Sequence, residues 1–80
     1  MGNFNYRGAV AITPGDTSVN NFARGVCQGI YVGGAGAIAA VMEDGTVATF
    51  SAVPVGTLLP IRATRVNSTN TTATLLLALY

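Results

Sequence analysis

The chain of 80 residues contains no histidine, no lysine and no tryptophan, and it has a single cysteine. Without histidine the commonest general base is missing. One cysteine cannot form an internal disulfide, and without histidine it cannot complete a zinc site. Asp16, Glu43 and Asp44 are the only acids, and their turn-like positions do not suggest a catalytic pair. We therefore expect no enzymatic activity, no metal and no cofactor, with Cys27 serving as a small buried hydrophobe.

Charge is scarce as well: 9% of the residues are charged, 50% are hydrophobic, and the formal net charge is +1. An ordinary soluble domain carries about 25% charged residues. A surface so poor in charge is hard to keep monomeric, which favours burial against partners, including other copies of the chain. No run of basic residues exists to attract nucleic acid. The longest apolar stretch, 75–80, is too short to span a bilayer, so we expect no membrane partner.

Turn signals recur every eight to twelve residues, which is typical of an all-β protein. We predict a small antiparallel β-barrel or sandwich of about six strands, with residues 1–7 as an N-terminal arm and residues 8–80 as one domain. The expected strands are 8–13, 26–32, 38–43, 46–50, 57–66 and 71–80.

Four local signals refine this prediction. Asp44-Gly45 is a strong hairpin signal between the third and fourth strands. The segment 67–70 predicts another hairpin, between the last two strands. Pro60 cannot donate a ladder hydrogen bond, which places it at an edge or a bulge. Asp16 is expected to close its own turn through nearby backbone N–H groups.

The glycine-rich segment 33–36 admits two interpretations. Residues 34–39 fit the dinucleotide-binding pattern G-x-G-x-x-A. That site needs a long helix after the glycines, and Asp44-Gly45 interrupts the chain too soon. A phosphate-binding loop would need a lysine, which the chain lacks. We therefore predict a turn that joins two strands.

The last strand indicates where copies of the chain could meet. Its second half is apolar on both faces, so we expect Leu76 and Tyr80 at a subunit contact. Arg62 and Arg65 are the favoured anchors for acidic or carbonyl groups of a partner protein, because arginine suits partly buried ion pairs. The alternative is that one or both arginines only solvate the sheet surface.

Several segments together resemble small virion proteins known as head spike-base proteins, which occur in tailed bacteriophages and gene transfer agents. The resemblance spans roughly residues 10–80 and is most specific over 53–66. It rests on Thr13-Pro14, Asp16, 30–33, Gly36, Val53-Pro54, 56–62, Arg65-Val66 and 71–74. It implies an all-β protein bound to the outside of a phage head, with no activity and no cofactor.

We therefore interpret the chain as a capsid decoration or spike-base protein that forms a small ring, with a trimer favoured over a pentamer, and docks on the major capsid protein. It could carry a further spike or fibre. The arm, with Phe4 and Arg7, is expected to contact the shell. The protein would lie on the outer surface of the head, and in the host cytoplasm before assembly. The alternative is a tail, baseplate or glycan-binding adhesion module that stacks sugars on Tyr6, Tyr31 or Tyr80.

Overall fold

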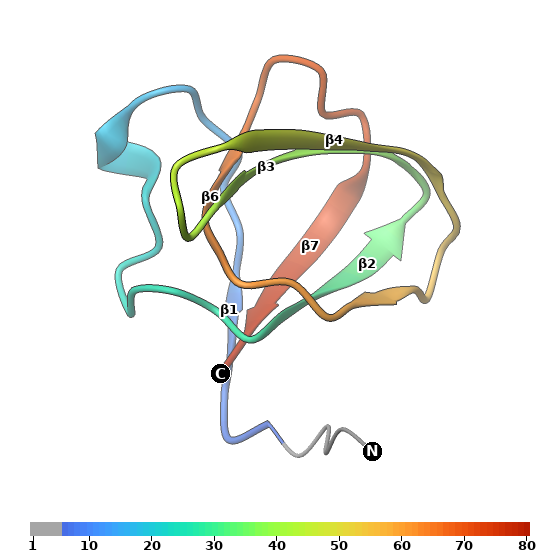
Figure 1. The fold of residues 1–80 in the computed structure, drawn as a ribbon. Coiled ribbons are helices and arrows are strands. Elements are labelled where there is room, and N and C mark those ends of the chain that lie inside the picture. The colour runs from blue at the N-terminus through green and yellow to red at the C-terminus, as the bar shows by residue number, and fades with distance from the viewer. Residues whose placement is uncertain (1–5) are drawn as a thin grey trace.

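The structure is a computed structural model that describes residues 6–80; Phe4, one of the predicted contact residues, lies outside them. The elements in chain order are β1 (Ala9–Ala11), the short 3-10 helix η1 (Ser18–Asn20), β2 (Gly29–Gly34), β3 (Gly36–Met42), β4 (Val47–Val53), β5 (Leu58–Leu59), β6 (Ala63–Asn67) and β7 (Thr74–Leu79) (Figure 1). The predicted all-β fold is confirmed.

The strands form two antiparallel sheets. Sheet A has the order β1-β7-β2-β5, and sheet B has the order β4-β3-β6. Within the described residues the two sheets do not close into one barrel, so the architecture is a sandwich. Seven strands replace the expected six, because the predicted strand 57–66 is divided in two.

The core lies between the two sheets and is built from branched and small apolar side chains. The largest fully buried side chains are Ile30, Ile38, Val32, Val66 and Cys27. The Cys27 thiol donates a hydrogen bond of 3.7 Å to the Ile61 carbonyl. Burial raises the pKa of this thiol, which keeps it protonated. Cys27 thus packs as a hydrophobe, as its neighbours in the sequence indicated.

The predicted Asp44-Gly45 hairpin is confirmed. It joins β3 to β4, whose register pairs Val41 with Val47. Gly45 takes a φ of 94°, which glycine adopts without steric cost. The Asp44 carboxylate accepts hydrogen bonds from the Thr46 backbone N–H at 3.0 Å and from its hydroxyl at 2.7 Å. The Asp44 carboxylate therefore stabilises the hairpin locally.

The glycine-rich segment is a corner between the two sheets. β2 belongs to sheet A and β3 to sheet B, and only Ala35 separates them. The predicted junction of two strands is confirmed, although Gly33 and Gly34 lie inside β2 instead of in a loop. Gly36 has a φ of 153°, and a Cβ on it would lie 2.5 Å from the Ala73 nitrogen. The close approach of the 72–73 backbone therefore requires glycine at this corner.

We expect Gly36→Ala to lower the free energy of unfolding by about 3 kcal/mol, since the added methyl group overpacks against backbone and the positive φ adds strain. The matched control is Gly56→Ala, where φ is 82° and a Cβ would meet nothing within 4 Å. In that variant the free energy of unfolding should fall only by the cost of placing alanine at a positive φ, about 1–2 kcal/mol. Urea unfolding measures both, and equal losses would show that the corner is not tightly packed.

Two predicted connections are wrong. The strand expected over 57–66 is interrupted at 60–62, so that β5 joins sheet A while β6 joins sheet B. Pro60 lies at this break, as its missing N–H requires. The segment 67–70 is not a hairpin either, because β6 pairs with β3 whereas β7 pairs with β1 and β2. It carries the chain from one sheet to the other.

Asp16 stabilises this crossover from 52 residues away in the sequence. Its carboxylate accepts hydrogen bonds from the Ser68 hydroxyl at 3.1 Å, the Thr69 N–H at 3.1 Å and the Thr69 hydroxyl at 2.7 Å. The expectation that Asp16 closes only its own turn is therefore corrected. Hydrogen bonds from Thr69, and then from Ser68, lower the pKa of Asp16 below its ordinary value near 3.8.

A lowered pKa in the folded state means that this carboxylate stabilises the fold at pH values above its ordinary pKa. The contribution is lost as the pH falls through the lower folded value. We therefore expect Asp16→Asn to be less stable than the wild type near neutral pH, and the difference to shrink and vanish in strong acid. Thermal unfolding across that pH range measures it. A pH-independent difference would contradict the role given to the charged carboxylate.

Candidate functional site

The outer face of sheet A presents an apolar surface. The strand registers place four side chains in one row across all four strands: Ala11, Leu77, Tyr31 and Leu58. Their inner-face neighbours Ile30 and Leu76 are buried in the core, so this row points outward. Tyr31 is 39% exposed. We call this outward surface the sheet A face.

An open groove of about 490 Å³ runs along the sheet A face. It is lined by Ala11, Ile12, Tyr31, Gly33, Leu75, Leu76 and Leu77. None of these side chains carries a charge. A Cβ on Gly33 would lie 2.8 Å from the Leu75 Cβ, so the missing side chain at Gly33 allows Leu75 to lie close against β2. The groove is suited to apolar side chains of a partner, not to ions or charged ligands.

Leu75 is the most exposed of the large hydrophobic residues that line this groove, and 77% of its surface is open to solvent. Its φ is 54°, a left-handed conformation that a leucine rarely adopts. Because of this kink, Thr74 and Leu75 are both exposed in succession, and the inward and outward alternation resumes only at Leu76. A strained backbone that directs a large apolar side chain into solvent is a feature of functional surfaces.

The kink also corrects the predicted contact at Leu76. This side chain is 3% exposed and belongs to the core between the sheets. In a regular strand Leu76 shares a face with the polar Thr72 and Thr74. The sequence therefore predicts that the face with Leu76 points outward. The structure reverses that assignment: Leu75 and Leu77 lie outward, whereas Leu76 and Ala78 lie inward.

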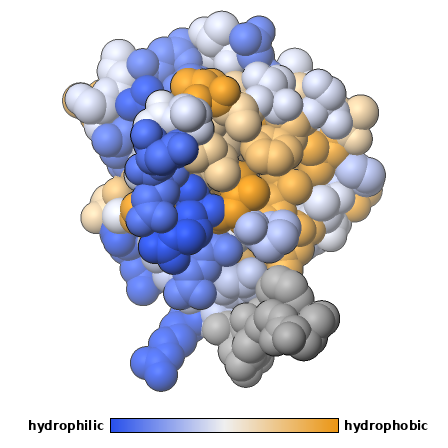
Figure 2. Space-filling view, viewed as in Figure 1, coloured by the Kyte–Doolittle hydropathy of each residue, from blue (hydrophilic) through white to orange (hydrophobic). Residues whose placement is uncertain are grey.

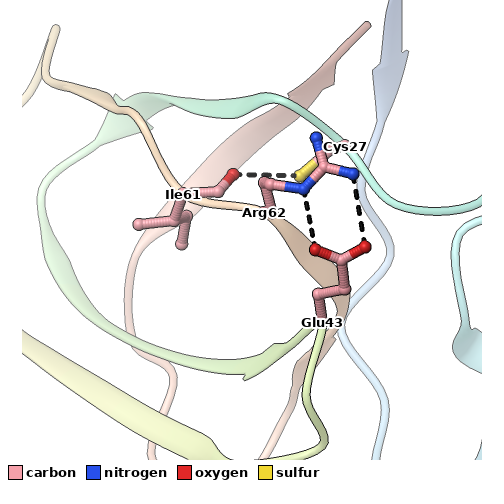
Figure 3. A network of polar contacts seen from close by, with 4 residues as sticks. All are labelled: Cys27, Glu43, Ile61 and Arg62. Atoms are coloured by element: carbon pink, nitrogen blue, oxygen red, sulfur yellow. Dashed lines mark hydrogen bonds and ion pairs between the residues drawn. The ribbon is translucent and has the colours of Figure 1, made fainter.

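Arg62 forms an ion pair with Glu43, as Figure 3 shows. Its Nε and one terminal nitrogen donate to the two carboxylate oxygens at 2.8 and 3.2 Å. These hydrogen bonds, and the charge of the partner, lower the pKa of Glu43 and raise that of Arg62. The two side chains are 60% and 52% exposed, so the pair lies at the surface. Arg62 therefore remains accessible, but its guanidinium already has a carboxylate partner.

The side chain of Arg65 makes hydrogen bonds to other residues of the same chain. Its Nε donates to Asn67 at 3.0 Å, and a terminal nitrogen donates to Asn21 at 3.0 Å. The bond to Asn21 connects β6 to the segment that follows η1, whereas Asn67 lies in β6 itself. The guanidinium is thus held by two amide oxygens, which supports a structural role alongside any contact with a partner.

Tyr80 and Arg7 lie where the two ends of the described chain meet. The Tyr80 hydroxyl donates to the Gly25 carbonyl at 2.9 Å, and the Arg24 guanidinium lies 4.5 Å from the centre of its ring. Burial raises the pKa of the Tyr80 phenol. The Arg7 side chain is exposed, and its backbone N–H bonds to the Tyr80 carbonyl. The predicted contact residues are therefore spread over separate regions, and the structure does not gather them into one site.

Among residues 6–80, no group of three or more histidine, cysteine or acidic side chains is placed to hold a metal ion. No helix in this described part of the chain is both long and apolar enough to cross a membrane.

Comparison with known proteins gives one informative likeness. No protein-family model matches the chain, and no curated protein matches it. The structure is similar to a chain in the capsid of a native gene transfer agent particle computed with C5 symmetry, with a TM-score of 0.82 and 28% sequence identity over 95% of this chain and 84% of that chain. The likeness supports a virion structural protein. It also favours a structural role over a catalytic one.

Residue patterns alone did not identify the members of the sheet A face. The patterns point to Tyr31 only for stacking sugars, and they point to neither Leu75 nor Ala11. The sequence does carry one signal for these residues, because the last strand is apolar on both faces. A domain this small can bury only one of the two faces, so the other is exposed to solvent. The choice between the faces depended on the positive φ at Leu75, which no periodicity reveals.

Proposed function

We propose that the chain is a capsid decoration or head spike-base protein that forms a small ring and docks on the outer surface of the major capsid protein. The observation that carries this proposal is the likeness to a chain of a gene transfer agent capsid, which extends over 95% of this chain. At 28% identity the likeness goes beyond the fold alone. The head spike-base resemblance of the sequence supports the same role.

The sheet A face is the surface best suited to this assembly. Its outward row and the neighbouring Leu75 are apolar, and no charged side chain lines its groove. Apolar area of this kind contributes about 25 cal/mol for each Å² that a partner removes from water. We assign the sheet A face to contacts between copies in the ring. Arg62 and Arg7, which are exposed, are assigned to the shell together with the N-terminal arm.

A ring of three copies is favoured over the competing number of five. Light scattering on the purified protein counts the copies. A mass of three or five chains supports the ring. A strictly monomeric species at high concentration would remove the self-assembly part of the proposal.

Docking is tested with purified particles that lack the protein. Added protein, labelled for imaging, is expected to saturate at a fixed number of copies distributed over the head. A charge-reversing variant of an exposed arginine, Arg62→Glu, is expected to weaken this binding, whereas Val19→Asp, on η1, is expected to bind normally. Label confined to the tail would favour the adhesion alternative, and absence of binding would refute the docking.

A further inference from the structure

Strand β4 leaves a long sheet edge unpaired. Sheet A ends in two short strands, β1 with three residues and β5 with two. Sheet B ends in β6 and in β4, which has seven residues. The outer edge of β6 is covered, because its carbonyls at Ala63, Thr64 and Val66 accept backbone hydrogen bonds from the 15–27 segment. Among residues 6–80, β4 pairs only with β3.

The atoms at this free edge follow from the hairpin register. The Met42 N–H donates to the Thr46 carbonyl, so Thr46 directs its backbone groups toward β3. Backbone groups alternate in direction with a period of two. The N–H and C=O groups of Val47, Thr49 and Ser51 therefore point away from the sheet. The side chains of these three residues are exposed as well.

Nothing in the sequence of this edge blocks pairing. Proteins usually protect edge strands with charges, proline, bulges or shortness. No charged residue occurs from position 45 to position 61. The left-handed Ala52, with a φ of 55°, and Pro54 disrupt only the far end of the strand. Residues 47–50 therefore form a regular, uncharged edge, and the register shift between Phe50 and Val53 follows them. In Figure 1 β4 crosses the upper part of the view, and Figure 2 shows hydrophobic residues gathered toward the right-hand side of the same view.

We propose that β4 pairs with β4 of a second copy, antiparallel across a two-fold axis at Thr49. A row of free N–H and C=O groups along a strand edge is a template for pairing with another extended backbone. A second copy supplies one of equal length, and the short edges of sheet A do not. The three outward-facing residues are centred on Thr49, so this register places Thr49 opposite Thr49 and Val47 opposite Ser51. Each of these pairs exchanges two hydrogen bonds.

Side chains support the same register. Threonine pairs directly opposite each other stabilise antiparallel strands. On the inner face, the half-buried Phe50 of each copy comes beside Ala48 of the other, which continues the core across the contact. The contact uses neither the sheet A face nor the exposed arginines. It is therefore independent of the ring and could link copies of neighbouring rings.

Cysteine cross-linking tests the pairing and its register. The Cα atoms of a directly opposed hydrogen-bonded pair lie about 5.5 Å apart, within reach of a disulfide. We expect Thr49→Cys to form a covalent dimer under mild oxidation. Val47→Cys, on the same edge, would place its thiols about 13 Å apart and is expected to cross-link at least tenfold more slowly. The double variant with Ser51→Cys should restore dimer formation. The native Cys27 is buried, so the wild type should form no covalent dimer and serves as the negative control.

The same experiment in a Leu75→Asp background separates this pairing from ring formation, because that variant disables the sheet A face. Covalent dimers from Thr49→Cys should persist there. Equal cross-linking at positions 47 and 49, or none at position 49, would overturn the proposal. As an independent measurement, Thr49→Lys should abolish concentration-dependent dimers in that background while leaving the far-ultraviolet circular dichroism unchanged. Dimers that survive Thr49→Lys would also overturn it.

Discussion

Leu76→Asp is expected to prevent folding near neutral pH. The side chain is 3% exposed in the core between the sheets, where a carboxylate would find no water and no cation. Burial of this kind raises the pKa of a carboxyl by up to about 3–5 units, roughly 4–7 kcal/mol. A domain of this length has a total stability of roughly 4–12 kcal/mol. The substitution therefore removes most or all of the stability.

Circular dichroism and urea unfolding measure this effect, with Leu76→Met as the control that keeps the apolar volume. Because the pKa of the new carboxyl is raised in the folded state, the variant should regain stability as the pH falls and the group becomes protonated. A natively folded Leu76→Asp chain that fails only to self-associate would restore the original placement of Leu76 at a subunit contact.

Leu75→Asp, one position earlier, is expected to leave the fold intact and to abolish assembly of the ring. The side chain is 77% exposed, so a carboxylate there stays hydrated in the single chain. Aspartate also tolerates the positive φ of this position better than leucine does. In the ring, however, the charge would be desolvated against apolar side chains, which is strongly unfavourable.

The matched control is Val19→Asp, which replaces an 87% exposed apolar side chain outside sheet A. Far-ultraviolet circular dichroism should show the wild-type fold for both variants. Light scattering should report loss of the ring for Leu75→Asp, which leaves single chains and dimers paired through β4, and intact rings for Val19→Asp. Rings that survive Leu75→Asp would exclude the sheet A face as the contact between copies, and loss of rings in both variants would show a nonspecific effect of charge.

Much of the fold could be predicted because its signals are local. The Asp44-Gly45 turn determines the β3–β4 hairpin through the conformational freedom of Gly45. The glycines of 33–36 indicate a junction between strands. The crossovers could not be predicted in this way. The break at Pro60 and the crossover at 67–70 depend on which sheet each strand joins, and this is decided by contacts such as that of Asp16 with Thr69, 53 positions apart.

The candidate site was harder to predict than the fold. The composition, with 9% charged residues, correctly indicated that apolar surface remains open, as at Leu75 and Tyr31. It did not indicate which face of the last strand is exposed. The left-handed backbone at Leu75 shifts the alternation by one residue, and one residue is enough to exchange the two faces of a strand.

The most direct test of the central claim is an image reconstruction of the intact virion at a resolution that traces the chain. We expect this two-sheet fold on the outside of the head, arranged in a ring, with Leu75 and Tyr31 covered by a neighbouring chain. A head lattice without this fold, or one in which the sheet A face remains open to solvent, would contradict it.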